Sequence, residues 1–233
     1  MIKKIEFNKL FESNLGWLQS RFHFSFAEYF NPQNINFGAL RVMNDDIVQP
    51  KTGFTTHPHK DMEIFSYLLD GELTHGDSMG NKETLQRGDM QYMSAGTGVL
   101  HSEMNNHPQK PTRFIQTWIV PNSKNLQPNY GSKRFTKEDR LNKWLHLLGG
   151  ENSDAYVNIH QDANAYVSEI ESGRALKMPL LDGRQAYLKV MEGSIKINDT
   201  ELNHGDAAEI TDEDINIFAQ TNAHIMLIEL AKV

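Results

Sequence analysis

Cysteine is absent from all 233 residues of the sequence. This absence excludes disulfide bonds, thiolate zinc sites and cysteine nucleophiles, so histidine, carboxylate or backbone oxygen must bind any metal. No stretch approaches 18 uncharged apolar residues, so no membrane-spanning helix is expected. Charges at Lys3 and Lys4 interrupt the N-terminal segment, which therefore does not resemble a signal peptide. We expect a cytoplasmic protein without membrane contact.

Basic residues are also few. Lysine and arginine total 23 against 30 aspartates and glutamates, which gives a net charge of −7. This charge disfavours direct contact with nucleic acid. A serine–histidine–aspartate pattern, a phosphate loop and a dinucleotide fingerprint are all missing from the sequence. The remaining partners are a small molecule or another protein, and we take a monomer as the working expectation.

Short apolar or alternating runs dominate what is present. They are rich in isoleucine, valine, phenylalanine and tyrosine, and glycine, aspartate and asparagine bound them. They cover residues 37–42, 63–69, 89–93, 113–120, 156–159, 165–170, 187–191, 194–197, 215–219 and 225–230. This spacing predicts a barrel or sandwich rather than βαβ units. We expect a short helix at 137–141 with Thr136 as its N-cap, and we interpret Asp45 and Asp46 as a turn.

A weak internal repeat divides the sequence. Residues 67–73 followed by 87–89, and residues 188–195 followed by 204–206, each consist of a strand, a glycine turn, a strand and a Gly-Asp turn. Two copies predict a duplicated β-barrel. The polar segment 121–132 is a plausible linker. We expect an N-terminal domain over residues 1–125 and a C-terminal domain over residues 126–233.

Two pairs of polar residues indicate a metal site. His57 and His59 are two residues apart, so they share one face of a strand, and His101 and Glu103 repeat this spacing. On neighbouring strands of a small barrel, the pairs would converge on the interior. Imidazole and carboxylate ligands suit Fe(II), Mn(II), Co(II), Ni(II), Cu(II) or Zn(II) better than calcium or magnesium. Four such ligands leave coordination positions open for a substrate.

The sequence around these pairs is similar to a known family. Residues 53–63 with 67–71 resemble the first cupin motif, and residues 88–103 resemble the second in its pirin version. Segments 16–18, 24–26 and 40–46 are also similar to pirin segments. The chain is identified as a member of the pirin family of the cupin superfamily, resembling bacterial pirin-like proteins described as quercetin 2,3-dioxygenases. The resemblance implies an all-β bicupin, with two tandem jelly-roll-like barrels and few short helices.

The resemblance also implies which residues bind the metal, which is often iron. They are the residues matching His57, His59, His101 and Glu103, and we expect Fe(II) first. Spacing alone leaves Glu63 as an alternative carboxylate ligand, because it has the strand parity of His57 and His59. The resemblance selects Glu103 and places Glu63 beside the site. The second copy of the repeat lacks both histidine pairs, so no metal is expected there.

The activity implied by the resemblance is cleavage of a flavonol such as quercetin by molecular oxygen, with Glu103 as the general base. Further residues could line a pocket for a flat phenolic ligand: Phe54, His75, Met93, Phe114 and Trp118. The alternative is a pirin-like, metal-binding, redox-responsive regulatory protein that acts through a protein partner. Cupin folds carry many functions, so the fold does not decide between these hypotheses.

Overall fold

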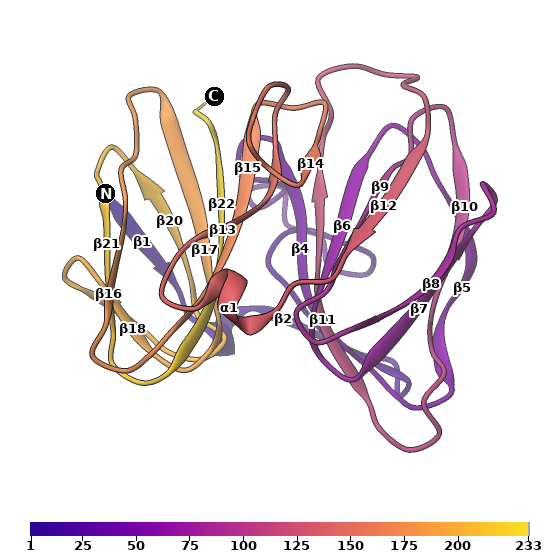
Figure 1. Ribbon diagram of the computed structural model, residues 1–233, viewed down its shortest axis with the longest axis horizontal. Helices are drawn as coiled ribbons and strands as arrows, with labels where there is room; N and C mark the ends of the chain where they lie inside the picture. Colours follow the sequence, from indigo (N-terminus) through magenta and orange to yellow (C-terminus); the bar gives the residue numbers. More distant parts are fainter. Residues whose placement is uncertain (233) are drawn as a thin grey trace. The chain divides into compact units, whose positions relative to one another are not determined.

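β-strands form nearly all of the regular structure in the computed structural model, which describes residues 1–232 (Figure 1). The strands of the first half are β1 (Ile2–Ile5), β2 (Phe11–Asn14), β3 (Leu18–Phe22), β4 (Leu40–Val48), β5 (Thr52–His59), β6 (Glu63–Asp70), β7 (Glu72–Asp77), β8 (Lys82–Gln86), β9 (Met90–Ser94), β10 (Val99–Asn105) and β11 (Thr112–Ile119). Those of the second half are β12 (Asn129–Lys133), β13 (Leu145–Gly149), β14 (Val157–Asn158), β15 (Ala163–Ile170), β16 (Ala175–Met178), β17 (Arg184–Glu192), β18 (Ile195–Ile197), β19 (Thr200–Leu202), β20 (Ala207–Thr211), β21 (Ile215–Ala219) and β22 (Ala223–Ala231). The helical elements are η1 (Phe7–Lys9) and α1 (Lys137–Arg140). Within residues 1–232, no helix is long and apolar enough to cross a membrane.

The chain forms two compact units, which we call the first barrel (residues 11–135) and the second barrel (residues 1–10 and the chain from Thr136 onward). The first barrel contains a four-stranded sheet, β5-β10-β7-β8, and a seven-stranded sheet, β12-β9-β6-β11-β4-β3-β2. The second barrel repeats this plan with β16-β21-β18-β19 and β1-β20-β17-β22-β15-β13-β14. The predicted all-β duplication is therefore confirmed.

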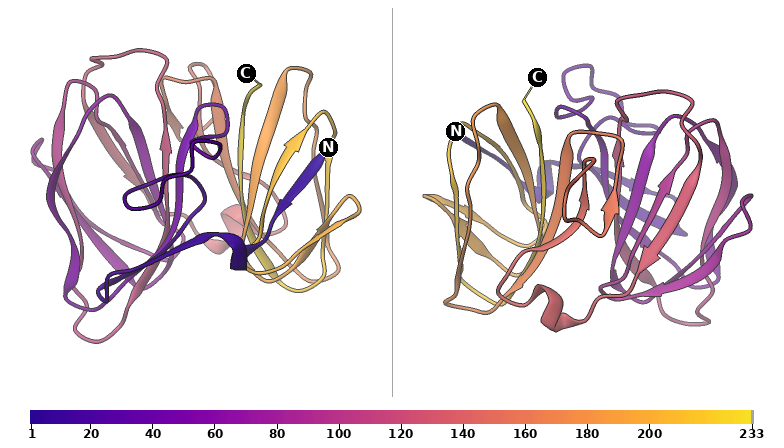
Figure 2. Two further views of the ribbon diagram at one scale, coloured as in Figure 1. Left: turned by 180° about the vertical axis from the view of Figure 1, so that it is seen from behind. Right: turned by 45° about the horizontal axis from the view of Figure 1, so that its top comes forward.

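The limits of the two units follow the hydrogen bonds of their outermost strands. β12 pairs with β9, with Tyr130 opposite Met93, so the first barrel extends to residue 135. β1 pairs with β20, with Ile2 opposite Ile210, so the first ten residues belong to the second barrel (Figure 2). These limits differ from the expected ranges 1–125 and 126–233. The difference arises because pairing partners far along the chain decide where a strand belongs.

Glycine turns confirm the internal repeat. Gly71 joins β6 to β7 and Gly193 joins β17 to β18, with φ of +74° and +78°. L-residues rarely adopt this conformation, so glycine is favoured at both turns. Asp89 and Asp206 follow the second turn of each copy, and each carboxylate accepts the backbone N–H three residues earlier at 2.9 Å. The two copies thus share their turn chemistry as well as their strand order.

An apolar core fills the space between the two sheets of each barrel. In the first barrel, Leu68 and Phe114 of the seven-stranded sheet pack with Leu73 and Leu85 of the four-stranded sheet. The core of the second barrel consists of alanine, valine, leucine and isoleucine side chains contributed by both sheets. Burying branched side chains between the sheets is the main stabilising contribution in such a fold. Polar groups concentrate instead in the interior of the first barrel, as described below.

The turn expected at Asp45 and Asp46 is wrong, because both residues lie within β4 and are buried. The guanidinium of Arg113 donates two hydrogen bonds of 2.8 Å to the Asp45 carboxylate. The hydroxyl of Ser20 donates to Asp46. A strand tolerates buried acids when other strands supply such partners.

The short helix expected at 137–141 is confirmed as α1. The Asp139 carboxylate in the first turn of α1 accepts a hydrogen bond of 2.7 Å from the backbone N–H of Thr136, and this bond completes a capping box. The apolar residues that follow form strand β13 rather than a continuation of the helix.

Candidate metal centre

Strands β5 and β10 place three imidazoles on one face of the four-stranded sheet. The strands are antiparallel, with His101 opposite His57 and Val99 opposite His59. Alternation along β5 puts His57 and His59 on the same side. One ligand atom of each of the three histidines lies within 4.8 Å of the others. Two residues from one strand and one from its neighbour therefore form a compact cluster.

The nitrogen positions fit one transition metal ion. The Nε2 atoms of His57 and His101 are 3.0 Å apart. Nitrogens bound about 2.0–2.1 Å from one ion, at tetrahedral or octahedral angles, are separated by about 2.9–3.4 Å. His57 Nδ1 lies 2.7 Å from the carbonyl oxygen of Thr55, which only accepts, so Nδ1 carries the hydrogen and Nε2 keeps its lone pair.

Burial keeps two of these imidazoles neutral. Burial and, secondly, the neighbouring imidazoles together lower the pKa of His101 to about 2 and that of His59 to about 4. A neutral imidazole offers its lone pair to a metal without first losing a proton. His59 and His101 are therefore ready to accept a cation at neutral pH.

Glu103 follows His101 on β10, and three hydrogen-bond donors surround its carboxylate. Oε1 accepts from the hydroxyl of Ser66 at 3.1 Å and from the amide of Gln91. Oε2 accepts from the amide of Gln116 at 2.7 Å. Complete burial raises the pKa of Glu103, and the His75 imidazole together with the hydrogen bonds from Ser66 and Gln116 opposes the rise. Glu103 is not part of the group formed by the three histidines, but it is two residues from His101 on the same strand.

The structure does not bring Glu63 to the cluster. β5 ends at His59, and β6 begins at Glu63 in the other sheet. The hydroxyls of Tyr92 and Ser94 donate to the Glu63 carboxylate. Ser66 of the same strand points into the barrel, where its hydroxyl contacts the Glu103 carboxylate. Glu63 has the opposite strand parity to Ser66, so its side chain points away from the barrel interior. Equal parity would place Glu63 beside His59 only if both lay on one continuous strand, but the chain changes sheet between His59 and Glu63.

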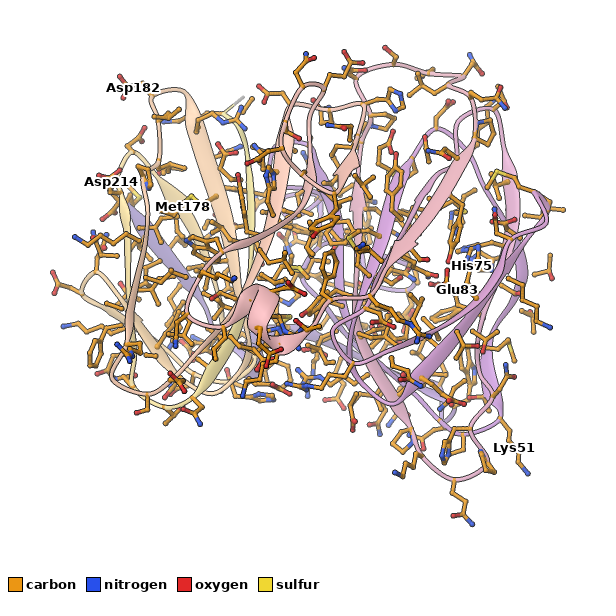
Figure 3. All side chains as sticks on the ribbon, viewed as in Figure 1. Lys51, His75, Glu83, Met178, Asp182 and Asp214 are labelled. Atoms are coloured by element: carbon orange, nitrogen blue, oxygen red, sulfur yellow. The ribbon has the colours of Figure 1, made fainter. Side chains whose placement is uncertain are left out.

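His75 lies beside the cluster, on β7. Its ring centroid is 5.5 Å from that of His101, and the ring stacks on Tyr130 at 4.2 Å. Its Nε2 is 2.9 Å from the Asp77 carboxylate, which fixes the orientation of the imidazole. Figure 3 labels His75 and Glu83, which are opposite each other on β7 and β8. His75 thus borders the metal candidate site as a fourth imidazole.

Trp118 and Met93 form an apolar wall next to His59. The indole of Trp118 meets the His59 ring edge-on at 4.9 Å and the ring of Phe26 at 5.3 Å. Met93 belongs to a buried cluster against which Trp118 packs. The wall combines one large aromatic ring with a flexible thioether side chain, and such a surface suits a planar apolar ligand.

Phe54 and Phe114 belong to the core of the first barrel. Phe114 is fully buried, and Phe54 packs against the same cluster. The ring of Phe54 is 6.3 Å from that of His57. Phe54 therefore borders the histidines from the core side, and Phe114 supports the core.

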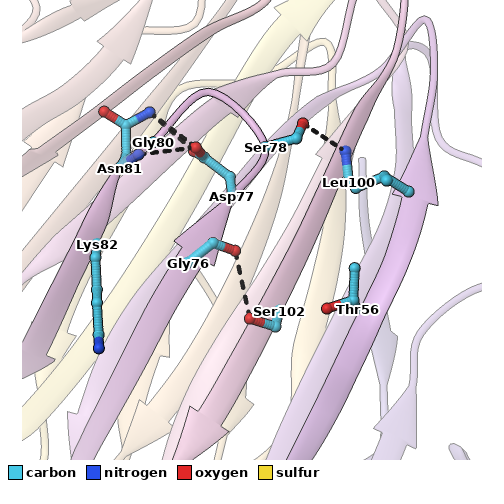
Figure 4. A pocket seen from close by; sticks show the side chains of 9 residues that line it. All are labelled: Thr56, Gly76, Asp77, Ser78, Gly80, Asn81, Lys82, Leu100 and Ser102. Atoms are coloured by element: carbon cyan, nitrogen blue, oxygen red, sulfur yellow. Dashed lines mark hydrogen bonds between the residues drawn. The ribbon is translucent and has the colours of Figure 1, made fainter.

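Two hollows lie along the four-stranded sheet. The hollow that reaches an imidazole has a volume of about 600 Å³ and is lined by Pro58, His59, Lys60, Ser78, Gly98, Val99 and Leu100. The other, of about 410 Å³, is lined by Thr56, Gly76, Asp77, Ser78, Gly80, Asn81, Lys82, Leu100 and Ser102 (Figure 4). Many polar groups of the second hollow bond to one another, as Asn81 does to Asp77 and Ser102 to Gly76. The hollow of about 600 Å³ touches His59, but Pro58 and Leu100, which also line it, alternate with the three histidines and face the other side of the sheet.

Sequence reasoning missed the polar residues around Glu103. Ser66, Gln91 and Gln116 each occupy a buried position in a strand that is otherwise largely apolar. That pattern was the available signal, because a buried polar side chain requires a partner. Asp46 was also missed: burial raises its pKa to about 8, and the charge of Glu103 contributes to the rise.

Comparisons with known proteins agree over both barrels. Residues 4–119 match the family described as Pirin, and residues 137–230 match the quercetinase C-terminal cupin domain. A pirin-like protein of Caulobacter vibrioides is 43% identical over 99% of this chain and 100% of its own length. Quercetin 2,3-dioxygenase of Escherichia coli K12 is 37% identical over 97% of each chain. The crystal structure of the Escherichia coli bacterial pirin YhhW in complex with nickel(II) has a TM-score of 0.94 and 36% identity, and covers 100% of both chains.

Proposed function

The chain belongs to the pirin family of the cupin superfamily, and we propose that it is a metal-dependent dioxygenase that cleaves a flavonol such as quercetin with molecular oxygen. The observation that carries the proposal is the group of three imidazoles whose ligand atoms lie within 4.8 Å of one another. Two relatives support it: one is named quercetin 2,3-dioxygenase, and the other was solved with nickel(II).

We propose His57, His59 and His101 as metal ligands and Glu103 as the fourth. Fe(II) is the ion we propose first, and Mn(II), Co(II), Ni(II), Cu(II) and Zn(II) also suit imidazole ligands. A bound ion of this kind would supply a positive charge that stabilises a flavonol anion and the redox chemistry that a reaction with oxygen needs.

Glu103 is the proposed acceptor of the flavonol hydroxyl proton. Its carboxylate offers about four lone pairs, and three donors occupy three of them. Two donors act on Oε1 and one on Oε2, so one lone pair remains on Oε2. At any moment Glu103 can use that position either to bind a metal or to accept a proton.

The aromatic wall would orient the substrate. Trp118 and Phe26 present perpendicular rings next to His59, and Met93 adds a soft apolar surface. None of Trp118, Phe26 and Met93 lines the hollow of about 600 Å³ that reaches His59. The aromatic wall, and not that hollow, is therefore the surface that we propose for the substrate ring.

The test is to load the protein with Fe(II), add quercetin under oxygen, and follow loss of the flavonol absorbance together with release of carbon monoxide. We expect turnover by the wild type and none by His101→Ala. The assay is repeated with manganese, cobalt, nickel and copper at measured metal occupancy. If none of the loaded forms cleaves quercetin, the enzyme proposal fails, and a regulatory role through a protein partner replaces it.

A further inference from the structure

We infer that Trp118 and Gln116 form a positioning pair that directs the Glu103 carboxylate in the interior of the first barrel. The indole N–H holds the amide of Gln116 in one orientation, and that amide then donates to Glu103. The inference rests on the proposed metal site, because it concerns where the free lone pair of Glu103 points.

The amide of Gln116 has one satisfactory orientation. Its Oε1 accepts from Nε1 of Trp118 at 3.2 Å, and its Nε2 donates to Oε2 of Glu103 at 2.7 Å. An indole nitrogen can only donate, and an ionised carboxylate can only accept. Rotating the amide by 180° would place two donors face to face at Trp118 and two acceptors face to face at Glu103. Both contacts would be unfavourable inside a buried site.

Trp118 is itself held in place. Residues two apart on β11 share a face, so the indole lies on the same side of the sheet as Gln116. The indole makes two edge-to-face contacts, one with the ring of Phe26 and one with the ring of His59. One side chain therefore contacts a proposed metal ligand directly and reaches the proposed fourth ligand through a single amide.

Gln91 provides a comparison within the same site. Its amide also donates to Glu103, and a second N–H bond of 3.3 Å to the hydroxyl of Ser66 already restricts its orientation. The hydroxyl of Tyr130 donates to Oε1 of Gln91 at 3.5 Å, which is longer and therefore weaker than the Trp118 bond. Tyr130 should accordingly contribute less to the position of Glu103 than Trp118 does.

Gln116 has the larger influence because of how the donors divide between the two oxygens. Among residues 1–232, two donate to Oε1, whereas one, Gln116, donates to Oε2. The remaining lone pair is on Oε2, so the direction of the Gln116 bond determines where that lone pair points. Loss of this bond should leave Glu103 less well oriented toward a metal ion.

A double-mutant cycle on Ni(II) affinity, measured by calorimetry, tests the pair. Trp118→Phe keeps an aromatic ring and removes the N–H, and Gln116→Met keeps the chain length and removes the amide. Losing a partner of this kind commonly weakens metal binding about 10- to 100-fold, so we expect Gln116→Met to weaken it at least about tenfold. Trp118→Phe should weaken it several-fold alone and cause no further loss in the Gln116→Met background. Additive losses would overturn the inference.

Tyr130→Phe is the matched control, because it also removes one aromatic donor to a glutamine that contacts Glu103. A loss of Ni(II) affinity as large as that of Trp118→Phe would contradict the proposed role. The carboxyl carbon NMR shift of Glu103 in metal-free protein, assigned with Glu103→Gln, gives a second readout. It should move in Trp118→Phe and stay constant when Trp118→Phe is added to Gln116→Met. If wild type binds neither Ni(II) nor any of the other proposed ions, the proposed function fails, whereas this shift still decides whether the pair exists.

Discussion

Replacing Asp46 with asparagine should stabilise the protein at neutral and mildly alkaline pH. Asp46 is completely buried on β4, where Ser20 donates to its carboxyl group. Burial raises its pKa to about 8, and the negative charges of Asp45 and Glu103 add to the rise. In the unfolded chain the same group titrates near its ordinary pKa of about 3.9. The folded protein therefore keeps a proton on Asp46 at pH 7 that the unfolded chain releases.

The sign and size of the effect follow from proton linkage. Between about pH 4 and pH 8 the folded state binds one more proton at this site, so the free energy of unfolding falls as pH rises. The slope for one proton is about 1.4 kcal/mol per pH unit, which amounts to about 4 kcal/mol between pH 4 and pH 7. Asparagine has nearly the same shape, does not titrate in this range, and keeps an oxygen that can accept from Ser20.

Urea unfolding of metal-free wild type and Asp46→Asn at pH 5, 6, 7 and 8 checks this reasoning. The free energy of unfolding of the variant minus that of wild type should increase by about 1.4 kcal/mol per pH unit up to pH 8. Asp45→Asn is the matched control: it breaks the paired hydrogen bonds from Arg113 and should destabilise at every pH. A pH-independent difference for Asp46→Asn would refute the conclusion that the folded protein keeps this carboxyl protonated.

Three further predictions concern the metal centre. His101→Ala should sharply reduce bound metal in elemental analysis, whereas replacing His204 should leave it unchanged; full occupancy in the first variant would refute the ligand set. Glu103→Ala should weaken Ni(II) binding more than Glu63→Ala in paired affinity measurements, and the reverse ranking would refute Glu103 as the metal ligand. Glu103→Gln should slow quercetin turnover at least about 100-fold because a neutral amide is a poor base, and unchanged turnover would refute its role as the base. Gly53→Ala should lower both Ni(II) affinity and the thermal unfolding midpoint, because its Cβ would overlap the backbone of Glu103 and push β5 from β10; unchanged values would show that the strands tolerate the separation.

The sequence predicted features that depend on local periodicity. The strand expected at 215–219 has the same bounds as β21, because alternation and flanking turn residues are properties of the segment itself. The grouping of His57, His59 and His101 follows from the same alternation once β5 and β10 are neighbours. Both predictions needed little beyond the geometry of a strand.

The features that the sequence did not predict depend on distant partners. Asp46 resembles a turn residue, and its place inside a strand depends on Ser20 and on the strands that cover it. Glu63 shares parity with His59 only if the strand continues, but the chain leaves that sheet at Asp61, which has a φ of +49°. Gln116 is an ordinary strand residue until the fold places Glu103 beside it. In each case contacts between residues far apart in the sequence decide the outcome.

The pairing of β1 with β20 has a consequence for the order in which the protein is made. Ile2 is synthesised about two hundred residues before Ile210, its partner in the sheet. The first barrel is one continuous segment and can fold while the ribosome is still translating the remainder. The second barrel cannot complete its seven-stranded sheet until β20 has emerged, and until then the backbone hydrogen-bonding groups of β1 lack this partner, while Lys3 and Lys4 disfavour pairing with other nascent chains. A recombinant fragment that starts at Thr136 would leave the edge of β20 exposed in the same way.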